Sequence, residues 1–173
     1  MKKNIIITFI SIIILIIIAI VVFFTIFQSA REQYTSEQQQ SIDLALENKG
    51  VTSIDKVDTF HGKIKYHVLS GINAEEQNIY IWIPKAKNKD DNKDKKMIVK
   101  KQSEGITKEE AISIVSKEYN MEKLINAKLG MDEGIPIWEV KYRDKSERYT
   151  IDYVDFKSGA IIKHMALKKE MNP

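Results

Sequence analysis

The chain has 173 residues, of which 43% are hydrophobic and 29% charged, a composition typical of a folded protein and not of a disordered one. Its 27 basic and 24 acidic side chains leave a net charge of +3, far below the strong positive field that a nucleic-acid partner requires. There is no cysteine, which excludes disulfides, thiolate metal sites, a catalytic thiol and a lipid-modified N-terminal cysteine.

Residues 5–27 form an apolar segment of twenty-three residues that carries no charge and contains twelve isoleucines. As a helix this segment spans roughly 35 Å, enough to cross a hydrocarbon core of about 30 Å. Two lysines precede it, whereas one arginine and one glutamate cancel after it, so the positive-inside rule places the N-terminus in the cytoplasm. We therefore predict a cytoplasmic tail at 1–4 and a transmembrane anchor at 5–27 in the cell membrane, with everything after residue 30 extracytoplasmic.

The alternative to an anchor is a cleaved secretory signal. The apolar segment is longer than the usual 7 to 15 residues of such signals. Its best cleavage site, with Gln28 and Ala30 on either side of Ser29, has a poorly fitting glutamine. An uncleaved signal anchor is therefore favoured, and both alternatives place the rest of the chain outside the cytoplasm.

The sequence after the anchor matches itself at an ungapped offset of 72, which indicates an internal repeat. The identical pairs include Thr35 and Thr107, Glu37 and Glu109, Ser41 and Ser113, Asn48 and Asn120, Gly62 and Gly134, and Val68 and Val140. We predict a stalk at 28–34, a first unit at 35–101, a second unit at 107–167 and a tail at 168–173.

Each unit begins with a pattern typical of a helix start. Thr35 with Gln38, and Thr107 with Glu110, fit the capping box, in which the threonine oxygen accepts the N3 amide. Apolar residues then recur at helical spacing, and Gly50 predicts the end of the first helix. Each helix therefore needs a surface to cover.

After each helix the hydrophobic period changes from 3.6 to 2, which indicates an antiparallel sheet. In the second unit the predicted strands are Trp138 to Tyr142, Tyr149 to Tyr153, and Ala160 to Met165. Their alternation predicts one apolar face, which holds Trp138, Val140 and Tyr142 together with Tyr149, Ile151 and Tyr153. A turn at Asp155 to Gly159 joins the last two strands, because Gly159 is free to take positive φ.

The first unit repeats this pattern. Its predicted strands hold Ile64, Tyr66 and Val68, then Ile79, Ile81 and Ile83, then Met97, Ile98 and Val99. The repeat places the charged run 85–96 in a long hairpin loop, although its composition also fits a linker or a contact with anionic polymer or lipid. The predicted fold class is α+β, with two tandem units of one helix packed on about four antiparallel strands.

The second unit resembles the PepSY-type domain, through its Thr107 to Ala111 helix start, its Trp138-Glu139-Val140 strand and its Asp155-x-x-x-Gly159 turn. The first unit is a degenerate copy, with Pro84 and the charged loop in place of that turn. The order of the whole chain, with an anchor, a Gln-rich start and two units, resembles the TseB-like (YpmB-like) regulators of cell wall elongation in Gram-positive bacteria. The resemblance implies a membrane-tethered, non-enzymatic protein that binds a penicillin-binding transpeptidase.

No residues with the spacing of a catalytic or metal site emerge from the sequence. His61, His67 and His164 lack metal-ligand spacing, and Ser113 and Ser116 lie on a predicted helix surface. The carboxylate pairs are Glu75 and Glu76, Glu109 and Glu110, and Asp152 and Asp155, of which only Asp152 has no evident structural role. Trp138 fits a core position, whereas Trp82 fits a core or an exposed stacking position equally well. We predict no catalytic, cofactor-binding or metal site and assign no interface residue.

The sequence therefore favours a binding module that acts beside the membrane bilayer, with no nucleic acid and no small-molecule substrate evident. The alternative is the other role associated with PepSY-type domains, inhibition or chaperoning of a secreted or membrane peptidase. An enzyme acting on wall peptide is the least supported reading.

Overall fold

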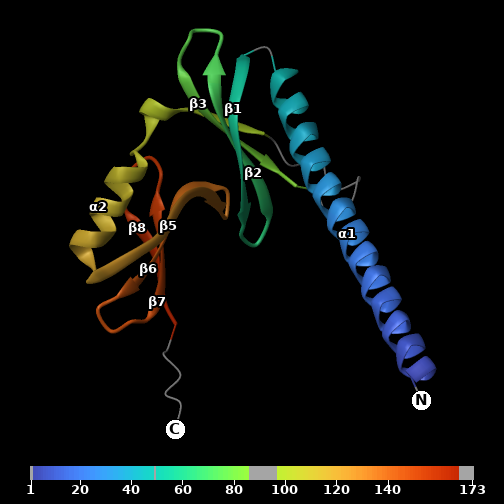
Figure 1. Ribbon diagram of the computed structural model, residues 1–173. Coiled ribbons are helices and arrows are strands. Elements are labelled where there is room, and N and C mark those ends of the chain that lie inside the picture. Colours follow the sequence, from blue (N-terminus) through green and yellow to red (C-terminus); the bar gives the residue numbers. More distant parts are fainter. Residues whose placement is uncertain (1, 49, 86–96, 168–173) are drawn as a thin grey trace. The chain divides into compact units, whose positions relative to one another are not determined.

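The computed structural model describes residues 2–48, 50–85 and 97–167, with side chains described over 12–28, 35–48 and the two later ranges. The chain divides after Gln40 into a purely helical unit and a compact unit that contains two sheets (Figure 1). Apart from Lys85, the predicted charged loop 85–96 lies outside the described residues, as does the predicted tail 168–173.

Helix α1 runs without interruption from Lys2 to Leu46. The predicted stalk 28–34 is therefore helical, and the prediction that a helix begins at Thr35 is wrong. No glycine or proline lies between Lys2 and Leu46, so no helix-breaking residue ends the helix before Leu46. Its large apolar side chains from Ile12 to Phe27 are all exposed. Within the described part of the chain, we find no helix long and apolar enough to span a membrane.

Both sheets are antiparallel and place their four strands in chain order. The strands of the first sheet are β1 (Val51–His61), β2 (Lys65–Asn73), β3 (Asn78–Pro84) and β4 (Ile98–Lys101). Those of the second are β5 (Met121–Asp132), β6 (Ile135–Asp144), β7 (Tyr149–Asp155) and β8 (Ile161–Ala166). Because β4 pairs with β3, residues 86–96 connect the two strands of a hairpin, as predicted.

The two sheets correspond strand for strand with a spacing that differs by one from the predicted 72. Leu69 pairs with Ile81 in the first sheet, and Val140 pairs with Asp152 in the second, so both partners lie 71 positions apart. The ungapped comparison therefore aligned neighbouring strand residues that point to opposite faces.

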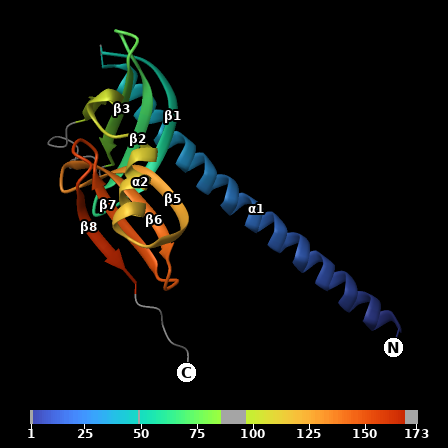
Figure 2. The same cartoon turned by 90° about the vertical axis from the view of Figure 1, so that its left-hand side faces the viewer.

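Helix α2 (Lys108–Glu118) follows a short 3₁₀ helix, η2 (Gln102–Glu104). Its predicted capping box is confirmed: the Glu110 amide donates to Thr107 Oγ1 at 3.2 Å, and the Thr107 amide donates to the Glu110 carboxylate at 2.7 Å. The Thr107 amide and the Thr107 hydroxyl both donate to the Glu110 carboxylate and lower its pKa. Helix α2 covers one face of the second sheet, where it contacts β5, β6 and β7 (Figure 2).

The predicted apolar face of the second sheet is wrong for β7. Val140 pairs with Asp152 and Tyr142 pairs with Thr150, so these two polar residues lie on the face that α2 covers. Tyr149 and Ile151 lie on the other face. Alternation along one strand gives its two faces, but only the register between strands shows which face is which. The same error affects β3, because Ile81 shares its face with Leu69 and not with Val68.

Two cores result from these faces. The first is aliphatic and holds Ala45, Val51, Leu69, Ile79, Ile81 and Ile83. The second is rich in aromatic side chains and includes Phe60 and Trp82 of the first sheet. The Trp82 indole N–H donates to the Gly130 carbonyl at 2.8 Å, and the Phe60 ring lies within 2.4 Å of where a Cβ on Gly130 would stand. The two sheets therefore pack directly on each other, and residue 130 must be glycine for this approach.

Candidate functional site

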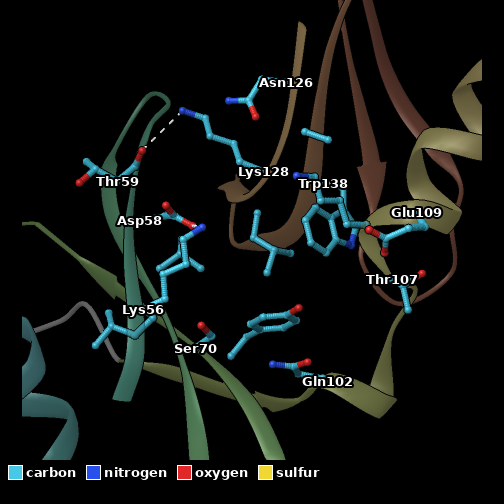
Figure 3. Close-up of a pocket in the computed structure, with 16 residues that line it drawn as sticks. Lys56, Asp58, Thr59, Ser70, Gln102, Thr107, Glu109, Asn126, Lys128 and Trp138 are labelled. Carbon is cyan, nitrogen blue, oxygen red and sulfur yellow. Dashed lines mark hydrogen bonds and ion pairs between the residues drawn. The ribbon is translucent and has the colours of Figure 1, made fainter. Parts of the chain in front are cut away.

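A cleft of about 480 Å³ lies between the two sheets, close to the start of α2 (Figure 3). Its labelled polar side chains come from β1, β2, η2, the start of α2 and β5. The lining polar residues are Lys56, Asp58, Thr59, Ser70, Gln102, Thr107, Lys108, Glu109, Asn126 and Lys128.

The floor of the cleft is apolar and closely packed. Trp138 is buried, and its indole N–H donates to the Ile106 carbonyl at 2.9 Å. The half-buried Tyr80 ring meets Trp138 edge to face, with 6.3 Å between ring centroids. Burial, and then the charge of Glu109, raise the pKa of Tyr80. These rings are engaged with each other and are poorly placed to stack on a sugar or a base.

The walls of the cleft carry both signs of charge. On β1, Lys56 Nζ lies 2.6 Å from Asp58 Oδ2. On β5, Lys128 Nζ lies 3.5 Å from the Thr59 carbonyl oxygen and 3.7 Å from a Glu139 carboxylate oxygen. Glu109 stands across the cleft, in the first turn of α2. An apolar floor with charged walls on both sides suits an extended polypeptide better than a uniformly charged polymer.

The hydroxyl-bearing side chains of the cleft are Thr59, Ser70, Tyr80 and Thr107, and no histidine lines it. Among the described residues, no group of three His, Asp or Glu side chains is placed to hold a metal ion. The arrangement offers hydrogen-bond donors and acceptors, which is the chemistry of recognition.

Asp152, for which the sequence suggested no role, is fully buried beneath α2. His164 Nδ1 lies 2.6 Å from Asp152 Oδ1, and the Tyr142 hydroxyl donates to Asp152 Oδ2 at 2.8 Å. Burial, and then the bond to Asp152, raise the pKa of Tyr142. The His164 ring also stacks on Tyr119 of the helix end, 4.1 Å away. Both carboxylate oxygens are thus used in joining β6, β7 and β8, and the residue has a structural role.

The other histidines lie apart from His164. His61 is exposed at the end of β1. His67 is buried in the first sheet, where its Nδ1 lies 2.6 Å from Ser41 Oγ. Ser113 and Ser116 are exposed on α2, as expected for helix surface.

The remaining predicted candidates occupy structural positions. Trp82 is fully buried between the sheets, so the core alternative for it is confirmed, as is the core position of Trp138. Glu75 contacts Lys101 at 3.4 Å in the first sheet. Asp155 accepts the amides of Lys157 and Ser158 and so shapes the predicted turn, in which Gly159 has a φ of 74°.

Sequence reasoning missed the cleft because its walls come from strands that it did not delimit. Strands β1 and β5 supply Lys56, Asp58 and Lys128, and both contain β-bulges that interrupt the alternation of period 2. A β-bulge shifts the side-chain pattern by one residue, which hides a strand from a search for strict alternation.

Comparison with known proteins identifies both sheets. Residues 40–84 match the model described as "Cell wall elongation regulator TseB-like domain", and residues 105–165 match "Peptidase propeptide and YPEB domain", or PepSY. The chain is 30% identical over 141 residues to the "Probable cell wall elongation regulator TseB" of Bacillus subtilis, which covers 82% of this chain and 84% of that protein. The chain belongs to the TseB-like family.

A solved structure agrees with this assignment to the TseB-like family. The YpmB protein from Bacillus subtilis superposes with a TM-score of 0.68 at 30% identity, and the match covers 75% of this chain and 96% of that one. The predicted resemblance to TseB-like and PepSY-type proteins is therefore confirmed, with the TseB-like model on the first sheet and the PepSY model on the second.

Proposed function

We propose that this protein is a membrane-anchored, extracytoplasmic and non-enzymatic regulator of cell wall elongation, which acts by binding a penicillin-binding transpeptidase. The observation that carries the proposal is the 30% identity to a protein named as a probable regulator of cell wall elongation, over 82% of this chain. The relationship includes both sheets, so it is not confined to one widespread module.

The sequence and the cleft support the same proposal. The uncharged segment 5–27 has the length and flanking charges of an anchor with its N-terminus in the cytoplasm. The cleft offers polar side chains of both signs around an apolar floor, which suits recognition of a polypeptide. A protein anchored by segment 5–27 would meet membrane-bound synthases first.

The full-length chain with a C-terminal affinity tag, cross-linked in the cells that produce it, tests the proposal. Recovered complexes are labelled with a fluorescent penicillin, which marks transpeptidases covalently. The expected result is a labelled complex that disappears when segment 5–27 is replaced by a cleavable secretory signal. A tagged protein that recovers no penicillin-labelled partner at native expression would contradict the proposal.

The PepSY match at residues 105–165 favours a second candidate, a peptidase inhibitor or chaperone. The same complexes distinguish the two functions, because a peptidase partner is identified by an active-site peptidase probe and not by penicillin. Inhibition of that peptidase by the purified full-length chain would replace the first proposal with the second.

A further inference from the structure

The face of the second sheet opposite α2 carries an excess of positive charge. Five cationic side chains lie on it: Lys123, Lys128, Lys141, Arg143 and Lys163. The strand register places these cations on the face of the sheet away from α2, whereas Trp138, Tyr142 and Asp152 point toward α2. We call this surface the open face. The first sheet covers one end of it, where Phe60 meets Tyr153 with 6.4 Å between ring centroids.

Acidic groups do not balance these cations. Glu139 is almost fully buried among lysines, 2.9 Å from Lys141 Nζ and 3.7 Å from Lys128 Nζ. Asp132 lies 3.2 Å from Lys163 Nζ. Asp155, which pairs with Ile137, lies on the same face and caps its own turn. Five cations against three carboxylates leave an excess of two positive charges. An exposed surface of this kind attracts an acidic partner and orients its approach.

Two of the exposed cations, Lys123 and Arg143, form an unfavourable like-charge pair. Lys123 and Arg143 are directly opposite each other on β5 and β6, and both are exposed. Like charges in directly opposed positions destabilise a sheet. Among the described residues, neither Lys123 nor Arg143 forms an ion pair. The Arg143 guanidinium donates instead to the Glu147 backbone carbonyl at 3.0 Å. A carboxylate from outside the chain, placed between them, would relieve this repulsion.

Apolar side chains alternate with the cations. Ile151 pairs with Lys141 on one side and with Met165 on the other, and Tyr149 pairs with Arg143. All three apolar side chains are only partly buried. This mixture of aromatic, methionine and basic side chains resembles the core and rim of protein interfaces and differs from a purely electrostatic surface.

We propose that the open face is the docking surface for the protein partner, which contributes an acidic segment carrying at least one apolar or aromatic side chain. The segment's carboxylates meet Lys123 and Arg143, and its apolar side chain packs on Ile151 and Met165. The inference rests on the proposed function, because the partner it names is the penicillin-binding transpeptidase.

The test uses the full-length chain in cells with a photoreactive residue at one of two positions. Ile151 lies at the centre of the open face, and Ser113 is exposed on α2, which lies on the other face of the sheet. Captured transpeptidase is detected by fluorescent penicillin. The expected result is capture from position 151 that exceeds capture from position 113 by about tenfold.

Charge reversal sharpens the test. The double variant K123E/R143E should lower capture from position 151 by about tenfold, because it places like charges opposite an acidic segment. The control K145E/K157E makes the same change in net charge at two exposed turn positions and should leave capture unchanged. The midpoint of thermal unfolding of each extracted variant is measured to check that neither has lost its fold.

The outcomes separate the inference from the proposed function. Transpeptidase capture that is equal at position 113, or unchanged in K123E/R143E, overturns the open face and leaves the proposed function intact. Capture from neither position, while cross-linking of the tagged chain still recovers a penicillin-labelled partner, overturns the open face alone. Failure of both experiments overturns the proposed function and the inference with it. If K123E/R143E stops the protein from binding phosphatidylglycerol vesicles but leaves transpeptidase capture unchanged, the open face contacts lipid and the inference is wrong.

Discussion

The two sheets share one strand order, yet they bury different chemistry at equivalent positions. Ile81 of the first sheet and Asp152 of the second each pair with an aliphatic residue of the preceding strand, 71 positions apart, and both are fully buried. Ile81 lies in an aliphatic core, whereas Asp152 binds Tyr142 and His164. The topology therefore accepts a carboxylate at this position only where neighbouring strands supply its partners.

The largest expected effect comes from moving the carboxylate into the wrong sheet. Ile81→Asp buries an ionisable group among Ala45, Leu69 and Ile79, with no hydrogen-bond partner in place. We expect the free energy of unfolding to fall by more than about 4 kcal/mol, measured by urea denaturation of the full-length chain.

A second substitution tests whether the missing hydrogen-bond partner explains the loss of stability. Val99 pairs with Ile81 as His164 pairs with Asp152. The double variant Ile81→Asp with Val99→His supplies one of the two missing partners and should recover part of the loss. A double variant no more stable than Ile81→Asp would show that the imidazole is not what makes the buried carboxylate tolerable.

The comparison of the two sheets also shows which features of the fold the sequence could predict. The capping box at Thr107 and the turn at Gly159 were predicted correctly, because each depends on residues close in sequence. Which face Asp152 occupies depends on the register between strands, and sequence alternation does not contain that information. Its partner His164 lies on another strand, so Asp152 had no visible role in the sequence.

The cleft and the open face were beyond sequence analysis for a related reason. Both combine residues from separate strands, such as Lys123 with Arg143 and Lys56 with Lys128. The helix start predicted at Thr35 was wrong for a different reason. The capping pattern there is correct locally, but it lies inside a helix that continues without interruption to Leu46.

Trp82→Ala tests how far the two sheets depend on each other. Trp82 belongs to the first sheet but is buried against the second, where its indole N–H binds the Gly130 carbonyl. Truncation should cost about 3–5 kcal/mol, because it leaves a large cavity and an unsatisfied carbonyl. We expect urea unfolding followed by far-UV circular dichroism and by Trp138 fluorescence to shift together.

The control is Trp82→Phe, which retains most of the apolar volume and should cost less than the alanine variant. Two separated transitions in Trp82→Ala, with only the first sheet destabilised, would mean that the sheets are less strongly coupled than their shared core indicates.

Asp152→Ala tests the polar cluster of the second sheet. It leaves the buried Tyr142 hydroxyl without its acceptor and His164 without its carboxylate, which should cost about 1–3 kcal/mol. Asp152→Asn retains one acceptor oxygen and should cost less. Equal losses in the two variants, measured by urea denaturation, would indicate that packing and not hydrogen bonding stabilises this position.

The smallest effect concerns two hairpin turns of the same construction. In the first sheet, Asn73 Oδ1 accepts the amides of Glu75 and Gln77 at 3.0 and 2.8 Å. In the second, Asp144 Oδ1 accepts the amides of Ser146 and Arg148, both at 2.9 Å. The two capping residues lie 71 positions apart and accept equivalent amides, so the turns share their geometry. They differ in the charge of the capping side chain.

That difference predicts that only the second turn responds to acid. Burial opposes ionisation of Asp144, but the amides of Arg148 and Ser146 and the Arg148 guanidinium, 2.7 Å away, outweigh it and lower the pKa of Asp144. A carboxyl with a lowered pKa contributes stability above its ordinary pKa of about 4, and that contribution is lost as pH falls through the folded value. Asp144→Asn should therefore flatten the decline of unfolding free energy below about pH 4, and Asn73→Asp should steepen it. An acid decline that Asp144→Asn leaves unchanged would place the acid sensitivity in other carboxyls, of which the lowered pKa of Glu110 makes the α2 cap the first to examine.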